Sequence, residues 1–210
     1  MLEHSAGLLL AAGLASRMDH RPKALLLRDG VSLVRRNALA LLRLGVKDVV
    51  VVVGHHATAL TQALVGLPVK IVHNLQPEAG QAQSLQLGLK SLDSDCQALV
   101  IALADMPLLE AADVQQVWHA FESRPAGADF VQPVRGDEVG NPVVIAARLF
   151  HEWRASSSPM LGKAWQQRNP SRVHHWPSPN PHFFVDLDTP EDLLKLQTQH
   201  GIQLDWPPAS

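Results

Sequence analysis

Residues Gly7 to Lys23 read GLLLAAGLASRMDHRPK, and this stretch decides the fold. It opens with an apolar run that is too short for an ordinary helix and that suits a buried strand. The run breaks at Gly13 into a loop of small residues that carries two cations, Arg17 and Lys23. Small side chains let backbone N–H groups approach an anion, and cations neutralise its charge. The stretch therefore predicts a strand followed by a phosphate-binding loop, with an ordinary surface loop as the alternative.

Outward from this stretch, apolar runs alternate with amphipathic segments. The β-branched run Val49–Val53 is typical of a strand buried on both faces, as in a parallel sheet. The other expected strands are Val69–Val72, Ala98–Leu103, Phe130–Val134, Val143–Ile145, Val173–Trp176 and Phe183–Val185, and the expected helices are Ser32–Leu44, Ala57–Val65, Ser84–Leu92, Asp113–Phe121, Arg148–Arg154, Gly162–Arg168 and Thr189–His200. This alternation predicts an α/β fold with a mostly parallel sheet covered on both faces.

Length and composition limit the number of domains and the class of protein. The chain has 210 residues, and we expect one domain over residues 1–210 with a loose tail from about residue 203. A content of 46% hydrophobic and 18% charged residues is typical of a soluble globular protein. A net charge of −2 provides no broad positive field, which argues against binding to nucleic acid or to a membrane surface. Phosphate binding therefore needs clustered cations or a metal.

The expected compartment is the cytoplasm. The single cysteine, Cys96, excludes an internal disulfide and suits a reducing environment, and we expect a buried, inert thiol there. No apolar run approaches the length of a membrane span. The opening residues MLEHSAG lack the basic and apolar regions of a signal peptide.

Carboxylates follow two of the expected strands. Ligands of such sheets bind outside the carboxyl ends of the strands. Asp105 directly follows one buried run, and Asp186 and Asp188 follow another apolar segment. Magnesium usually takes one or two protein carboxylates together with phosphate oxygens. Asp105 and Asp186 can therefore hold Mg²⁺, although turn formation and helix capping are alternatives for these residues.

Seven segments, in this order, resemble the nucleotidyltransferase family of molybdenum cofactor guanylyl- and cytidylyltransferases. The segments are Leu10–Gly13, Ser16–Met18, Pro22–Lys23, Gly80 with Ser84–Leu85, Asp105–Pro107, Gly140–Pro142 and Asp186–Pro190. The resemblance extends from about Gly7 to Leu196. The Ala-Ala-Gly of the opening stretch, where guanylyltransferases tend to have Ala-Gly-Gly, favours the cytidylyltransferase-like branch.

The resemblance implies a fold and a site. The fold is the Rossmann-like, three-layer α/β fold of nucleotide-diphospho-sugar transferases, with one antiparallel strand in a mostly parallel, mixed sheet. The implied nucleotide-binding residues are Leu10, Ala11, Ala12, Gly13, Arg17, Lys23, Gly80, Ser84 and Asp105, of which Arg17, Lys23 and Asp105 are also the implied catalytic residues. The implied Mg²⁺ ligands are Asp105 and Asp186, with Asp188 as the alternative second ligand, and the implied acceptor-binding residues are Gly140, Asn141 and Pro142.

The resemblance also implies a reaction. A nucleoside monophosphate, with CMP from CTP favoured, is transferred to the phosphate of molybdopterin cofactor, and pyrophosphate is released. The implied partners are a nucleoside triphosphate, a molybdopterin-type acceptor and a molybdoenzyme or its chaperone. Three alternatives remain: a sugar or polyol phosphate as acceptor, a maturation partner that binds nucleotide or cofactor without turnover, and a dinucleotide-binding oxidoreductase. The last is disfavoured because the opening stretch has no G-x-G-x-x-G pattern.

One residue departs from the family pattern. Asp19 stands where the family usually has glycine. An acid that pointed toward a triphosphate would repel it, so we expect Asp19 to point outward or to pair with Arg17 or Arg21.

Overall fold

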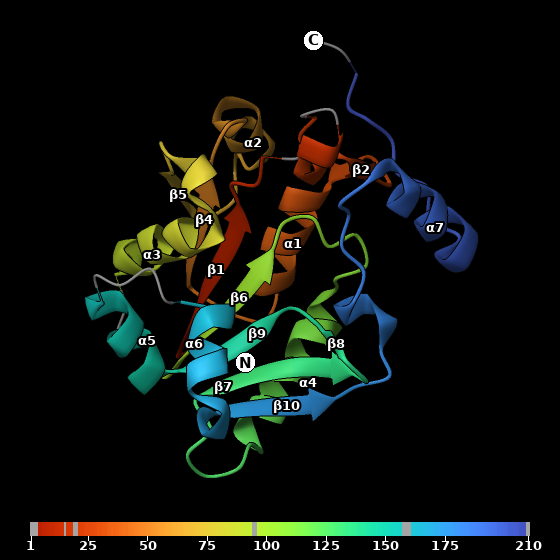
Figure 1. Cartoon of the computed structure of the whole chain (residues 1–210). Coiled ribbons are helices and arrows are strands. Elements are labelled where there is room, and N and C mark those ends of the chain that lie inside the picture. Colours follow the sequence, from red (N-terminus) through yellow and green to blue (C-terminus); the bar gives the residue numbers. More distant parts are fainter. Residues whose placement is uncertain (1–3, 15, 19–20, 94–95, 157–160, 209–210) are drawn as a thin grey trace.

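A twisted central sheet organises the computed structural model, which describes residues 4–14, 16–18, 21–93, 96–156 and 161–208 (Figure 1). The strand order is β10 (Val173–Pro177), β7 (Phe130–Arg135), β9 (Val143–Ala146), β6 (Ala98–Leu103), β1 (Ser5–Ala11), β4 (Asp48–Val53) and β5 (Lys70–His73), with β8 (Glu138–Val139) paired to β7. Strand β9 runs antiparallel to both of its neighbours, and every other pair along this order is parallel. The mostly parallel, mixed sheet is thus confirmed.

The centre of the sheet forms where the sequence is most apolar. Every residue of β1 is buried between β4 and β6, and so are Val49–Val53 of β4. Successive side chains of a strand point to opposite faces. Accordingly, Leu9 and Val51 belong to one core cluster, whereas Leu8 and Val50 belong to another. A strand that is apolar on both sides needs a cover on both sides, which explains the next layer.

Helices cover both faces of the sheet. The helices are α1 (Leu33–Leu42), α2 (Ala57–Ala63), α3 (Gln81–Ser91), α4 (Ala111–Glu122), α5 (Ala147–Ala155), α6 (Lys163–Arg168) and α7 (Pro190–His200). Residues of α1, α2 and α4 pack in the cluster of Leu9, and residues of α3, α5 and α6 pack in the cluster of Leu8. The three-layer arrangement is confirmed. Within the described residues, no helix is both long enough and apolar enough to cross a membrane.

Two expected elements need correction. Helix α3 begins at Gln81 rather than Ser84, because Gly80 adopts a φ of 96° and ends the preceding loop directly before it. The segment Phe183–Val185 is not a strand. Pro181 begins a 3₁₀ turn that runs to Phe183, and the Asn180 side chain accepts a hydrogen bond from the His182 N–H at 3.1 Å. The apolar side chain of Phe183 is buried in the core without joining the sheet.

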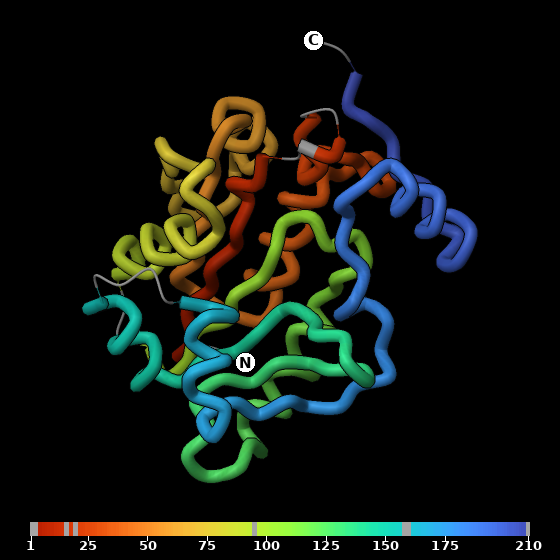
Figure 2. Tube along the Cα trace, in the orientation of Figure 1, coloured from red at the N-terminus to blue at the C-terminus, as the bar shows by residue number. Residues whose placement is uncertain are grey.

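The C-terminal segment also differs from expectation. Asp205 forms two backbone hydrogen bonds with Leu27 of β2 (Leu27–Arg28), at 2.8 and 3.0 Å, so the tail is not loose at this point. The guanidinium of Arg21 lies 3.7 Å from the centre of the Trp206 ring. Figure 2 shows the C-terminal trace returning to the first part of the chain. The end of the chain therefore packs against the segment that follows the opening strand.

A third, smaller apolar cluster forms at this contact. Met18, Leu26, Leu33 and Leu187 are buried together, and Leu193, Leu204 and Trp206 pack against them. Leu26 and Leu33 flank the short hairpin of β2 and β3 (Val31–Ser32), whose turn at Asp29 and Gly30 has φ values of 55° and 77°. Through Leu187 the cluster fixes the acidic segment near residue 187 beside the opening loop.

Candidate active site

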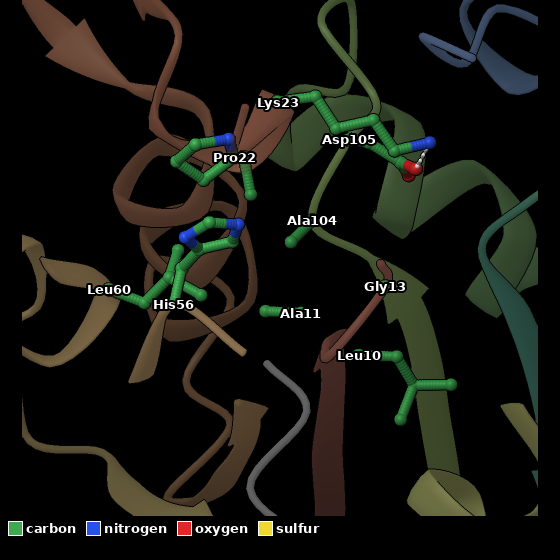
Figure 3. A pocket seen from close by; sticks show the side chains of 10 residues that line it. Leu10, Ala11, Gly13, Pro22, Lys23, His56, Leu60, Ala104 and Asp105 are labelled. Carbon is green, nitrogen blue, oxygen red and sulfur yellow. Dashed lines mark ion pairs between the residues drawn. The ribbon is translucent and has the colours of Figure 1, made fainter. Parts of the chain in front are cut away.

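The opening stretch forms a cavity at the carboxyl end of β1. Strand β1 ends at Ala11, and the chain after it passes so close to β4 that a Cβ on Gly54 would lie 2.7 Å from the carbonyl oxygen of Ala12. Glycine is therefore needed at position 54. Figure 3 shows the cavity, with Lys23 and Asp105 meeting on one side and His56 on another. Its lining residues are Leu10, Ala11, Gly13, Pro22, Lys23, Ala24, His56, Leu60, Ala104 and Asp105.

Lys23 connects two carboxylates from distant parts of the chain. Its Nζ lies 2.6 Å from Asp105 Oδ2 and 2.7 Å from Asp188 Oδ1. Arg17 adds a second cation, with Nη2 at 3.0 Å from Asp188 Oδ2, although its side chain is 68% exposed. The backbone N–H of Leu187 donates to the carbonyl oxygen of Asp105 at 3.2 Å, which brings the acidic segment to the end of β6. The structure thus brings together Arg17, Lys23, Asp105 and Asp188.

The electrostatics of the cluster are unbalanced toward negative charge. Burial by itself would lower the pKa of Lys23, but Asp105 and Asp188 outweigh it, so its pKa is raised and the ammonium stays charged. The pKa of Asp186 is also raised, first by desolvation and then by repulsion from Asp105 and Asp188. The residue Asp186 is exposed to solvent, yet the protein around its carboxylate is close enough to desolvate it in part. An additional cation would relieve this repulsion.

The donor atoms present fit a magnesium ion. Asp105 Oδ1 is buried and has no hydrogen-bond partner among the described residues. Asp186 makes no ion pair with any described residue, whereas Asp188 is occupied by both Arg17 and Lys23. No group of three or more His, Cys, Asp or Glu in the described ranges is arranged to hold a metal. A metal between Asp105 and Asp186 therefore needs further oxygens from a ligand, as Mg²⁺ bound with phosphates does.

A second cavity, of about 240 Å³, lies next to the first and shares Leu10, Gly13 and Asp105 with it. Gly80 and Ser84 line it at the start of α3. The Ser84 Oγ is buried and accepts a hydrogen bond from Asn74 Nδ2 at 2.9 Å. The Oδ1 of Asn74 accepts from the Gln76 N–H at 2.9 Å. Asn74 at the end of β5 therefore orients the hydroxyl that the sequence singled out.

Comparison with known proteins decides the family. The model of the MobA-like NTP transferase domain matches residues 7–173. The chain belongs to this family. It is also similar to the nicotine blue oxidoreductase of Paenarthrobacter nicotinovorans, with 30% identity over 196 residues that cover 90% of this chain and 95% of the relative.

Solved structures show the same fold as this MobA-like domain. A nucleotidyl transferase from Methanothermobacter thermautotroptrophicus aligns with a TM-score of 0.74 and 21% identity, covering 93% of this chain and 96% of the other. Rv0371c from Mycobacterium tuberculosis H37Rv, in complex with manganese, aligns with a TM-score of 0.72 and 19% identity, covering 92% and 97%. The recognition of the family and of its fold from short segments is thereby confirmed.

The Gly-Asn-Pro segment of the MobA-like domain is placed less simply than expected. Gly140 and Pro142 are buried, and Asn141 lines a cavity. A Cβ on Gly140 would lie 2.8 Å from the carbonyl oxygen of Phe183, and the Asn141 N–H donates to that same oxygen at 2.9 Å. Gly140 therefore serves the close approach of two backbones, whereas Asn141 lines a cavity.

Several residues in or beside the two cavities carried no sequence signal. Gln81 lines the second cavity and Asn74 orients Ser84, but neither stands in a segment that marked the family. Gln81 is the first residue of α3, so a correct helix start would have identified it. His56 lines the first cavity because it immediately precedes α2. Asp19, the one departure from the family pattern, lies outside the described residues.

Proposed function

We propose that this protein transfers CMP from CTP to the phosphate of a molybdopterin-type acceptor and releases pyrophosphate. The observation that carries the proposal is the cluster of Lys23, Asp105 and Asp188, with Asp186 beside it, at the mouth of the cavity that Gly80 and Ser84 line. Clustered cations give a protein of net charge −2 a local place for a triphosphate. CTP and the acceptor rest on the resemblance of the sequence.

The reaction needs no side chain as a general base. A phosphate monoester has a second pKa of about 6, so the acceptor phosphate is ionised at neutral pH. Its oxygen forms a bond to the α-phosphorus of the triphosphate, while the bond from that phosphorus to the bridging oxygen of the β-phosphate breaks. Pyrophosphate leaves with the electron pair. What the protein must supply is orientation and stabilisation of the charge that builds up on the phosphates.

Arg17 and Lys23 are proposed to exchange partners when the triphosphate binds. Asp188 holds both cations in place, at 3.0 and 2.7 Å. Phosphate oxygens carry more charge than a single carboxylate and can displace it. The Lys23 side chain is only 14% exposed and keeps its place, whereas the largely exposed Arg17 can swing onto the ligand. Asp188 then serves as the resting partner of the cations.

Asp105 and Asp186 are the residues proposed to hold Mg²⁺. When bound, the ion supplies neutralisation of charge on the phosphates and a fixed geometry. The unpartnered Oδ1 of Asp105 and the raised pKa of Asp186 support this pair over a pair with Asp188. Manganese in the structure of Rv0371c supports a divalent ion for this fold and does not distinguish it from magnesium.

The test is release of pyrophosphate. The protein and Mg²⁺ are incubated with each of the four common nucleoside triphosphates, first with molybdopterin and then with a sugar phosphate or a polyol phosphate. Release with CTP and molybdopterin alone is the expected result. Release only with a sugar or polyol phosphate assigns the alternative acceptor, and binding of CTP without release in any combination assigns a maturation partner.

One observation favours a second candidate function, that of a dinucleotide-binding oxidoreductase. The relative of 30% identity is named an oxidoreductase, and it spans nearly the same length as this chain. A redox reaction makes little use of two carboxylates grouped around Lys23. The check is to supply reduced nicotinamide adenine dinucleotide as the electron donor and a quinoid dye as the acceptor, and to follow the absorbance of the reduced nicotinamide. Oxidation at a steady rate, unchanged when Asp105 is replaced, would favour this candidate over nucleotidyl transfer.

A further inference from the structure

Three cavities follow one another along the face of the sheet that α3, α5 and α6 cover. The nucleotide-side cavity of about 240 Å³ shares Leu10, Gln81 and Leu103 with a cavity of about 150 Å³. That cavity in turn shares Gln132, Lys163 and Gln166 with a third, of about 320 Å³. We call the second and third cavities the distal trough. The trough begins beside the proposed site of reaction, where an acceptor must place its phosphate.

Four polar side chains that line the distal trough are not engaged. Gln81, Asn141, Lys163 and Gln166 form no side-chain hydrogen bond or ion pair with a described residue. Lys163 stands at the start of α6 and is exposed. Polar groups that are unengaged at the walls of a cavity are available to a ligand, and amide groups offer it both donors and acceptors.

Two buried atoms add to this picture. Gln132 Oε1 and Trp153 Nε1 lack hydrogen-bond partners among the described residues, and both residues line the distal trough. The orientation of the Gln132 amide follows from its Nε2, which donates to the Gly140 carbonyl oxygen at 3.0 Å. Gln132 is 6% exposed and Trp153 is 1% exposed. A buried polar atom without a partner is destabilising, so a bound group or water in this cavity has a hydrogen-bonding role to fill.

The charge of the distal trough is opposite to that of the reaction site. Within the described residues, the lining of the trough contains no Asp or Glu, and Lys163 gives it a positive charge. The reaction site, by contrast, gathers Asp105, Asp186 and Asp188. A ligand that spans both places therefore meets a cation far from its reacting phosphate.

We propose that Lys163 binds a second anionic group of the acceptor, while the amides of Gln81, Asn141 and Gln166 bind an uncharged, heteroatom-rich body between that group and the phosphate. The inference rests on the proposed function and makes it more specific. It describes the acceptor class as a phosphate monoester that carries a further negative charge. A simple sugar or polyol phosphate has an uncharged body and gains nothing from Lys163.

The test separates binding from turnover. Molybdopterin, with its anionic dithiolene, is titrated calorimetrically into the protein without nucleotide, and inositol 1-phosphate serves as the ester with an uncharged body. Lys163→Gln is compared with Lys163→Arg and with Lys90→Gln, a matched control because Lys90 is exposed on α3 and lines neither cavity. Affinity for CTP is measured for every variant, to detect a general loss of structure.

The expected result is a selective loss of affinity for molybdopterin. Removal of one charge-assisted hydrogen bond at a partly exposed site weakens binding by about tenfold in Lys163→Gln, and Lys163→Arg retains most of the affinity. Lys90→Gln, CTP binding and inositol 1-phosphate binding stay unchanged. Equal affinity of Lys163→Gln and the unaltered protein for molybdopterin, or no binding of molybdopterin at all, would overturn the inference. Selective loss of binding in a protein that releases no pyrophosphate would overturn the proposed function alone.

Discussion

The protein contains two clusters of carboxylates and cations, and they differ in balance. At the active site, Asp105, Asp186 and Asp188 face two cations, Arg17 and Lys23. One buried oxygen of Asp105 lacks a described partner, and the pKa of Asp186 is raised. This cluster carries an excess of negative charge within the folded protein.

The second cluster surrounds Asp129, at the other end of the sheet beside β7. Arg172 Nε lies 2.6 Å from Asp129 Oδ2, and Arg148 also binds this carboxylate. Glu152 accepts from Arg172 Nη2 at 2.8 Å and from Trp165 Nε1 at 3.2 Å. Burial alone would raise the pKa of Asp129, but the hydrogen bonds from both arginines outweigh it and lower the pKa.

The difference distinguishes structure from function. In the Asp129 cluster every carboxylate is paired with a cation, so the cluster is complete without a ligand, and removing one partner leaves an uncompensated buried charge. In the active-site cluster the charges balance only when a further cation enters. Unbalanced ionisable groups are concentrated at functional sites, and balanced networks are commonly structural. Four experiments test this contrast, beginning with the largest expected effect.

Asp105→Ala is expected to lower the rate of nucleotidyl transfer by roughly 10³-fold, because the substitution removes a proposed metal ligand and a partner of Lys23. The fold is expected to survive, since the side chain has an unpartnered oxygen. Steady-state kinetics and thermal unfolding measure the two effects. Glu122→Ala, an exposed acid at the end of α4, is the control. Near-normal turnover in Asp105→Ala would remove this residue from the site.

Asp129→Ala is expected to do the reverse, with a loss of about 2–3 kcal/mol in the free energy of unfolding and unchanged turnover per folded molecule. Breaking a buried ion pair costs about 3–5 kcal/mol, and the effect is reduced here because Arg148 is 65% exposed. Urea denaturation measures the loss. A stable Asp129→Ala variant with impaired turnover would show that the second cluster is not structural.

Asp192 tests a satisfied carboxylate next to the active site. It accepts hydrogen bonds from the N–H groups of Asp188 and Thr189, at 3.0 and 2.8 Å, in the capping box of α7. Burial by itself would raise the pKa of Asp192. The hydrogen bonds from Lys195 and from the two backbone N–H groups outweigh burial and lower this pKa to about 2. The resulting stability is present above the unfolded pKa of 3.8 and is lost as the pH falls toward about 2.

Asp192→Asn is therefore expected to lower the free energy of unfolding by about 1 kcal/mol at neutral pH. Below pH 4, the stability of the variant is expected to fall less steeply than that of the unaltered protein. Denaturation at a series of pH values measures both effects. Identical acid profiles for the variant and the unaltered protein would contradict the capping role of the charge.

Asp186→Asn is expected to produce the smallest effect on the fold and the opposite sign. Because the pKa of Asp186 is raised, the folded state holds the proton more tightly than the unfolded state. Its contribution to stability falls as the pH rises from the unfolded value of 3.8 through the folded value. The variant removes this decline and is slightly more stable at neutral pH. The added stability that Mg²⁺ with CTP confers on the unaltered protein is expected to shrink in the variant, as thermal unfolding measures. A less stable variant with full protection by Mg²⁺ and CTP would contradict the proposed metal ligand.

The sequence by itself determined the centre of the sheet and the family. Runs of apolar residues predicted the ends of β4 and β6 to within one residue, because strands covered on both faces are apolar throughout. Asp105 stood out because it follows such a run directly, and it lines the cavity at the end of β1. The start of α7 was predicted as well, since a cap at Thr189 followed by Pro190 and two acids is a local pattern.

Only the tertiary structure decided how distant segments meet. Lys23 and Asp188 are 165 positions apart, and no local pattern predicts their contact. The segment Phe183–Val185 resembled a strand because its residues are apolar, but the turn at Pro181 and the contact of Phe183 with Gly140 give it another backbone. Lys163 received no role from the sequence, since a cavity exists only after α6 packs beside β7 and β9. Hydrophobic periodicity reports burial along one element, whereas a site depends on the elements that surround it.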